Sequence, residues 1–264
     1  MASYHTRSNS FPSKSHPIAD ELDQQLCRLR SSETASTSSL TDKLTGLKDL
    51  YMCVDEFLQL PVKQNTPYDS WVEKVLDGSL SLLEICATSR DVFAQSKERI
   101  QEIQSALRRR SSGELNITNE VAEYLKTRKT VKKMIKKCLK EMKQVEKTNE
   151  ANPIDGMLID VQAITADTFI SLLSYIGGSQ KSSWSFSKLV RGQRVEKETS
   201  ASISEFDAVD ATLELMISQK KKSIVDMSQL VKLESEIQEI DKGLECLFRN
   251  LVKTRATLLN VVSN

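Results

Sequence analysis

The stretch LVKLESEIQEIDKGLECLFRNLVKTRATLLNVV, residues 230–262, decides the fold, because apolar residues recur through it in alternating steps of three and four. The series is Leu230, Leu233, Ile237, Ile240, Leu244, Leu247, Leu251, Thr254, Leu258 and Val261. Only Thr254 interrupts its apolar character. This spacing predicts one long helix over residues 223–262 with a continuous apolar seam.

Two further features of this stretch indicate what covers the seam. Acidic side chains fill its first half and basic ones its second, which complements the helix dipole. Additional apolar residues widen the seam: Phe248, Val252, Leu259 and Val262. A wide apolar face suits the interior of a helical bundle better than a two-stranded coiled coil. Self-association through the seam is the competing interpretation, since it would use the same residues.

Upstream of this stretch, apolar periodicity and capping residues predict several more helices. A second seam consists of Leu40, Leu44, Leu47, Tyr51, Val54 and Leu58. Helix starts are indicated by Pro17, by Thr66–Asp69, by Asn152–Asp155 and by a capping box at Ser202–Glu205. The sequence therefore predicts an all-α protein, a single antiparallel bundle of about six long helices over residues 16–264, with the last helix central.

Two segments are expected to lie outside this bundle. Residues 1–15 contain five serines and two basic side chains but no acid, which predicts a disordered basic tail. Residues 177–200 are rich in Gly, Ser and Lys and predict a long surface connection. Trp184 stands out there, either fixing the connection to the bundle or serving as an exposed interface anchor.

The N-terminal tail carries a candidate modification site. Arg7-Ser8-Asn9-Ser10-Phe11-Pro12 follows the R-S-x-S-x-P pattern that phosphoserine-reading 14-3-3 proteins favour when Ser10 is modified. A phosphate at Ser10 would offer charge-assisted hydrogen bonds to an arginine cluster. Serine-rich tails also produce such patterns by chance, so a solvated tail remains the alternative.

Composition places the chain among intracellular proteins. The 37 basic and 36 acidic residues nearly cancel, which gives no overall case for nucleic acid binding. Five well-separated cysteines without a CxxC pair suit reduced thiols: Cys27, Cys53, Cys86, Cys138 and Cys246. The start lacks an apolar signal region, and the uncharged apolar stretch at 168–180 is shorter than the roughly 20 residues of a membrane span. We expect a cytoplasmic protein, at most peripheral to a membrane.

The strongest electrostatic feature is a run of ten basic residues between Lys126 and Lys147 that keeps a helical apolar stripe. Its like-charge pairs four residues apart cost the helix on the order of 1 to 3 kcal/mol, so an acidic counterpart is expected. Internal candidates are residues 20–23, residues 205–214 and the acidic half of the last helix. The external candidate is an anionic lipid surface or acidic partner, contacted by Lys132, Lys133, Lys136, Lys137 and Lys140. Aromatic residues are absent from this face, which disfavours nucleic acid.

The residues needed for catalysis are scarce. The two histidines, His5 and His16, both fall at the expected disordered end, which leaves no histidine for a catalytic triad or zinc site in the bundle. Phosphate-cradling glycine motifs and the GxSxG motif do not occur. We therefore expect a protein that is not an enzyme and that has no cofactor or metal.

Several blocks, in order, resemble the Bypass-related family of land plants, catalogued as a domain of unknown function. They are RSNSFPSKSHP, ELDQQLCRLR, YDSWVEKVLDGSLSLLEICATSRDVF, SWSFSKL and LESEIQEIDKGLECLFRNLVKTRATLLN. The resemblance implies an all-helical plant protein linked to root and shoot development, without catalytic or ligand residues. Combined with the seams, it predicts a non-enzymatic helical scaffold or regulatory protein with protein partners. The alternative is a peripheral membrane protein that binds anionic lipid through residues 126–147.

Overall fold

The computed structural model describes residues 17–31, 37–60, 71–110, 117–145, 153–178, 204–219 and 226–263. Within these ranges the chain forms seven helices and no strand, which confirms the predicted all-α class. The helices are α1 (Pro17–Ser31), α2 (Thr37–Leu58), α3 (Trp71–Arg110), α4 (Thr118–Val145), α5 (Pro153–Gly177), α7 (Glu205–Gln219) and α8 (Met227–Ser263). The expected tail at 1–15 and most of the expected connection at 177–200 lie outside the described residues.

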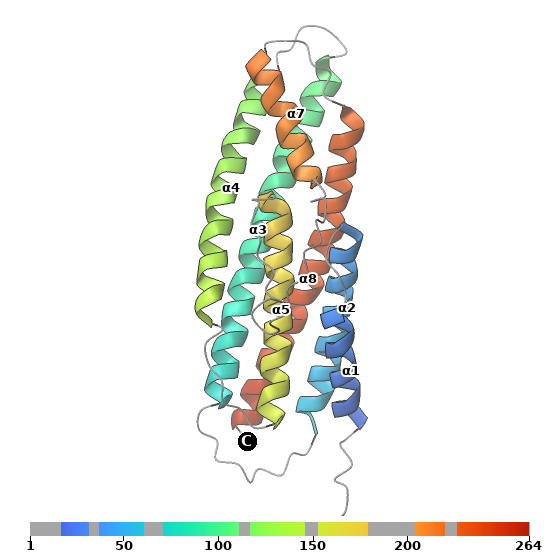
Figure 1. Cartoon of the computed structure of the whole chain (residues 1–264), viewed down its shortest axis with the longest axis vertical. Coiled ribbons are helices and arrows are strands. Elements are labelled where there is room, and N and C mark those ends of the chain that lie inside the picture. The colour runs from blue at the N-terminus through green and yellow to red at the C-terminus, as the bar shows by residue number, and fades with distance from the viewer. Residues whose placement is uncertain are drawn as a thin grey trace, which may run out of the picture.

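The helices lie side by side along one long axis, so the molecule is elongated (Figure 1). Helix α8 packs most extensively against α3 and α2, which makes it the element that these two share. Helix α5 packs against α3, α2, α4 and α1, while α7 covers the upper part of α4. Each element can bury an apolar stripe because its neighbours flank it along most of its length.

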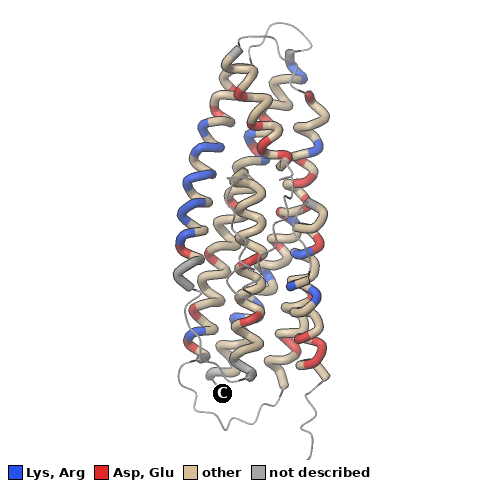
Figure 2. Tube along the Cα trace, in the orientation of Figure 1, with Lys and Arg blue, Asp and Glu red and all other residues tan. Residues whose placement is uncertain are grey.

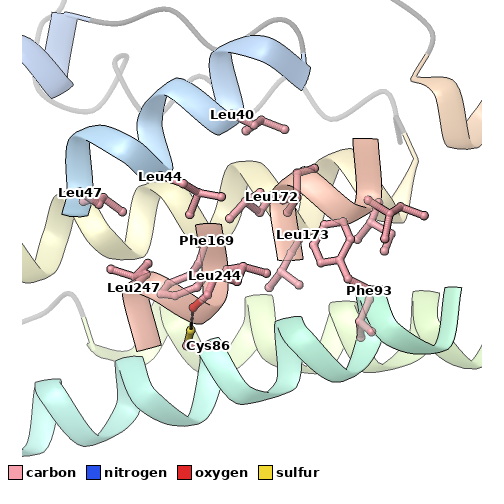
Figure 3. Packing of buried hydrophobic residues seen from close by; sticks show 14 of the residues in the cluster. Leu40, Leu44, Leu47, Cys86, Phe93, Phe169, Leu172, Leu173, Leu244 and Leu247 are labelled. Carbon is pink, nitrogen blue, oxygen red and sulfur yellow. Dashed lines mark hydrogen bonds between the residues drawn. The ribbon is translucent and has the colours of Figure 1, made fainter. Parts of the chain in front are cut away.

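The seam of α8 is the centre of the core. Its buried members are Leu230, Leu233, Ile237, Ile240, Leu244, Leu247, Leu251, Thr254 and Leu258. Leucines of α2 and aromatic residues of α3 and α5 pack around them (Figure 3). Cys86 of α3 lies at the same level and directs its thiol to the carbonyl oxygen of Leu244, at 3.6 Å. Burial inside one chain therefore accounts for this seam.

Three residues that the seam pattern placed inside are on the surface. Val252 and Leu259 are 46% and 42% exposed, so the prediction that they widen the buried face was wrong. Val261, predicted as the last residue of the seam, is 42% exposed, so that prediction was wrong as well. The reason is geometric: α3 and α2 approach α8 on the sides of its central stripe, and the outward side is left uncovered. Phe248 is partly buried and packs on the core, as expected.

Close approach of α2 to α8 depends on one glycine. A side-chain carbon at Gly243 would lie 2.8 Å from Cδ1 of Leu44, which is closer than carbon atoms pack. Leu44 is buried against α8 because that space is empty. The glycine, in the middle of a long helix, is therefore a packing requirement.

Candidate functional site

Helix α4 divides its residues sharply between two faces. Val121, Tyr124, Arg128, Val131 and Ile135 are buried, at the spacing of one helical stripe. The lysines between them are exposed apart from Lys132, and Figure 2 shows basic residues recurring along this helix. The one cation inside the stripe, Arg128, is 2% exposed, and it organises the site.

Arg128 pairs with Asp210 of α7, which is itself 6% exposed. Nε lies 2.9 Å from Oδ1 and Nη2 lies 2.9 Å from Oδ2, so the pair is bidentate. The remaining terminal nitrogen, Nη1, donates to the carbonyl oxygen of Ile176 at 2.8 Å. That carbonyl belongs to the last turn of α5, which has no following helical turn to bond to it. One guanidinium thus joins α4, α5 and α7.

Asp210 has two further donors from α4. The hydroxyl of Tyr124 donates to Oδ1 at 2.8 Å, and Nζ of Lys132 lies 3.0 Å from Oδ2. Burial opposes ionisation of this carboxyl, but the hydrogen bonds and charge of Arg128, aided by Tyr124 and Lys132, outweigh it and hold the pKa of Asp210 below its ordinary value. For Tyr124, burial and then the charge of Asp210 raise the pKa well above its usual range. The site therefore holds an aspartate and a neutral tyrosine.

An aromatic pair extends the network toward α8. The guanidinium of Arg128 lies 4.8 Å from the ring centroid of Phe206, and the Phe206 ring meets Tyr175 edge to face at 5.6 Å. The hydroxyl of Tyr175 lies 2.8 Å from Oε2 of Glu236 and 3.1 Å from Oε2 of Glu205. Lys232 bridges the same two carboxylates from α8. Polar contacts consequently fix α7 to three other helices.

Gly178, directly after α5, has a special backbone conformation. Gly178 follows the last turn of α5 with φ of +81°, a left-handed conformation that glycine adopts without strain. A side-chain carbon there would also lie 2.1 Å from Oδ1 of Asp207. Ser204 precedes α7 and caps it, since its hydroxyl accepts a hydrogen bond from the Asp207 amide at 3.2 Å. The cap expected at Ser202 is therefore at Ser204, two residues later, and Ser202 lies outside the described residues.

The five lysines predicted to contact an anionic surface divide into two groups. Lys132 is half-buried and bound to Asp210, so it belongs to the internal network. The other four are exposed: Lys133, Lys136, Lys137 and Lys140. Lys137 lies 3.7 Å from Glu141 on its own helix, an exposed pair of small energy. We define these four exposed residues as the lysine column.

Internal pairing thus neutralises only part of the basic run. Of the acidic segments that could have covered α4, residues 205–214 do so, and only through Asp210. Within the described ranges, Lys133, Lys136 and Lys140 have no ion-pair partner. The lysine column therefore faces solvent, while the opposite face of α4 is fixed by the contacts of Arg128 with Asp210 and Ile176.

Sequence reasoning named Asp210 as one of several possible counter-charges but missed that Arg128 is the buried cation. It also missed a second buried carboxylate, Asp55 of α2. Lys253 Nζ lies 2.7 Å from Asp55 Oδ2, and the Thr257 hydroxyl donates to Oδ1 at 2.9 Å. The position of Arg128 could have identified it as the buried cation, because it falls on the apolar stripe of α4, four residues from Tyr124, and not on the lysine face.

Three of the thiols in the described residues are kept in their protonated form by burial. Burial is the main cause that raises the pKa of Cys53, Cys86 and Cys138. The pKa of Cys86 rises to about 12. A raised pKa lowers the population of the thiolate, which is the reactive form. In the described part of the chain, no group of three His, Cys, Asp or Glu side chains is placed to hold a metal ion. A hollow of about 370 Å³ lies between α1 and α2 and is lined by Arg28, Asp42, Lys43 and Asp49 among others.

By length and composition, one described helix could cross a membrane, namely α5 from Gly156 to Gly177. In this structure its apolar side chains form core: Phe169, Leu172, Leu173 and Ile176 are fully buried. A soluble core helix passes the same test of composition. Packing against neighbouring helices therefore accounts for these four apolar residues of α5.

Two further predicted sites, Ser10 and Trp184, lie outside the described residues, so their environments stay predictions.

Comparison with known proteins gives one relevant result. Residues 43–261 match the family model described as Protein BPS1. No curated protein and no solved structure matches the chain.

Proposed function

The chain belongs to the BPS1 family, and from this premise we propose that it is a non-enzymatic scaffold or regulatory protein of plant growth and development. The match confirms the resemblance to the Bypass-related plant family. In this proposal the described helices form one antiparallel bundle around α8, and the protein acts in the cytoplasm on root and shoot development. In this proposal the protein binds protein partners and does not catalyse a reaction.

The observation that carries the proposal is the lysine column. A flexible lysine-rich segment would lose conformational entropy on binding, whereas α4 is already fixed by the Arg128 contacts to Asp210 and Ile176. Its like-charge neighbours repel one another until an acidic surface approaches. An acidic protein surface that runs alongside a helix fits this column in both sign and shape.

Affinity capture from root and shoot extracts tests the scaffold role. The column variant carries Lys133→Gln, Lys136→Gln and Lys140→Gln. A control carries the same charge change on other helices, at the exposed Lys48 and Lys74 and the half-buried Lys97. We expect partners that the unaltered chain and the control retain and the column variant loses. Equal recovery by all three proteins would contradict a role for the column, and turnover abolished by a point mutation that leaves the fold intact would overturn the scaffold proposal itself.

A second candidate function is favoured by the same column: peripheral binding to anionic lipid. Basic side chains along one straight helix can all reach a flat, negatively charged surface, each contributing about 1 kcal/mol. The exposure of Lys133, Lys136, Lys137 and Lys140 along α4 is the observation that supports this role. Such binding weakens with salt because the charges are exposed.

Vesicle flotation distinguishes this role from a protein contact. Purified chain is mixed with neutral phosphatidylcholine vesicles or with vesicles containing phosphatidylserine, at low and moderate salt. Binding to the anionic vesicles alone, lost in the column variant and kept in the control variant, supports lipid binding. Absence of binding at low salt removes this candidate and leaves the acidic protein partner.

A further inference from the structure

The outer side of α3 and α8 carries an apolar strip that no described helix covers. Its most exposed members are Leu80 of α3 and Val252 and Leu259 of α8, each between 42% and 46% exposed. Partly buried apolar residues lie on the same sides of these helices: Leu76, Leu83 and Phe248. Leu80 lies about 200° around α3 from Gly78, which packs on α5, so the strip faces away from α5.

Two contacts between α3 and α8 fix the level at which the helices meet along this strip. Arg255 donates to the Leu76 carbonyl oxygen and to the Ser79 hydroxyl, the latter at 2.8 Å. Further along, the Arg90 guanidinium lies 5.7 Å from the Phe248 ring centroid. These contacts show that α3 and α8 lie side by side from Leu76 to Arg90, with the partly buried Arg90 and Arg255 side chains between their apolar residues.

Charges of opposite sign border the strip. On the α3 side, exposed acids recur every seven residues: Asp77, Glu84, Asp91 and Glu98. On the α8 side, Lys242 and Arg249 are exposed and also seven residues apart. Arg249 bonds Glu245 within α8, yet its side chain remains 74% exposed and available to a second partner.

The acidic and basic borders lie at the same height. Cys86 and Arg90, which contact Leu244 and Phe248, fall between Glu84 and Asp91 along α3. Leu244 and Phe248 fall in turn between Lys242 and Arg249 along α8. Two acids on one border are therefore level with two bases on the other, at the height of Phe248 and next to the exposed apolar residues Leu80, Val252 and Leu259.

We propose that this surface binds a second copy of this chain, about a two-fold axis that runs parallel to the helices. Such an axis places α3 of each copy on α8 of its partner at the same height. The dimer therefore has two equivalent contacts, and in each of them the acidic border of one copy faces the basic border of the other. A two-fold axis across the helices would instead bring acid against acid. The apolar strip supplies the dry centre of the interface and the charges supply its rim and register.

This surface differs from the heptad seam of α8, which is buried within the single chain. Polar residues in the buried seam would unfold the protein, whereas polar residues in the outer strip leave the core intact. That difference allows a clean test with the full chain. The interface does not depend on the proposed function, because it uses neither the lysine column nor a plant partner.

Sedimentation equilibrium over a range of protein concentrations measures the association. We expect twice the chain mass for the unaltered protein and at least tenfold weaker association for Val252→Glu with Leu259→Glu. The matched control, Met52→Glu with Leu215→Glu, changes two equally exposed apolar residues on other helices and should keep the dimer. Circular dichroism checks that both variants stay folded. A monomer at every concentration, or a dimer unaffected by the strip variant, overturns the proposal.

Charge exchange tests the orientation. Glu84→Lys with Asp91→Lys, and separately Lys242→Glu with Arg249→Glu, should each weaken the homodimer. Mixing these two variants should restore a dimer, because one α3–α8 contact then has exchanged charges and the other has the original ones. Failure of the mixture to associate more tightly than either variant alone contradicts the two-fold arrangement.

Discussion

Asp210 of α7 receives both nitrogens of the Arg128 fork, and the two residues are almost wholly shielded from water. Removing one partner would leave a buried charge uncompensated, which typically costs 3 to 5 kcal/mol. We predict a loss of about this size for Arg128→Met and for Asp210→Leu, measured as the free energy of unfolding in urea. The double variant should recover part of the loss. Additive losses in the double variant would contradict a coupled pair.

The same pair gives the protein a defined sensitivity to acid. The pKa of Asp210 is depressed in the folded state, so the unfolded chain binds the proton more readily. The stabilisation from Asp210 is therefore complete above its unfolded pKa of about 4 and is lost as the pH falls through the lower folded value. We predict that the difference in unfolding free energy between the unaltered chain and Asp210→Asn shrinks below about pH 4. A difference that stays constant with pH would show that Asp210 is not ionised in the folded state.

Gly178 is predicted to be intolerant of a side chain. Its φ of +81° disfavours other residues by about 1 to 2 kcal/mol, and an added carbon meets Asp207. Gly178→Ala should therefore lower the free energy of unfolding by at least this amount. Gly156 provides the control, because nothing lies within 4 Å of its added carbon. Gly156→Ala should be neutral or stabilising by up to about 1 kcal/mol, since alanine favours helix. Equal effects at both sites would exclude a special backbone requirement at Gly178.

Much of this architecture follows from local patterns. The seam around Leu244 and the start of α5 at Pro153 can be read from spacing and capping residues, because both depend on neighbours in sequence. The outward position of Val252 cannot, since it depends on which sides of α8 are covered by helices far away in the chain. The partner of Arg128 cannot be read from local spacing either, because Asp210 lies 82 positions later in the chain. Periodicity identifies which residues share a face, while the packing decides which face is buried.

The tail offers a prediction that rests on sequence alone. The pattern around Ser10 favours recognition by phosphoserine-reading 14-3-3 proteins once Ser10 carries a phosphate, because the phosphate adds charge-assisted hydrogen bonds to arginine. We predict that chain phosphorylated at Ser10 binds a recombinant 14-3-3 protein in calorimetry and that Ser10→Ala treated identically does not. Retained binding by Ser10→Ala would assign recognition to another site.

Two apolar residues of α8, eight positions apart, should respond oppositely to truncation. Leu244 is fully buried in the seam, whereas Val252 is 46% exposed on the outer strip. Leu244→Ala removes buried carbon and leaves a cavity, which should cost about 2 to 5 kcal/mol in the free energy of unfolding. Val252→Ala should change that free energy by no more than about 0.5 kcal/mol, because surface changes of this kind rarely do more. The measurement should use dilute protein, where self-association adds no stability. A large loss at Val252 in dilute protein would mean that the outer strip is covered within the single chain, and both the packing around α8 and the proposed dimer would then be wrong.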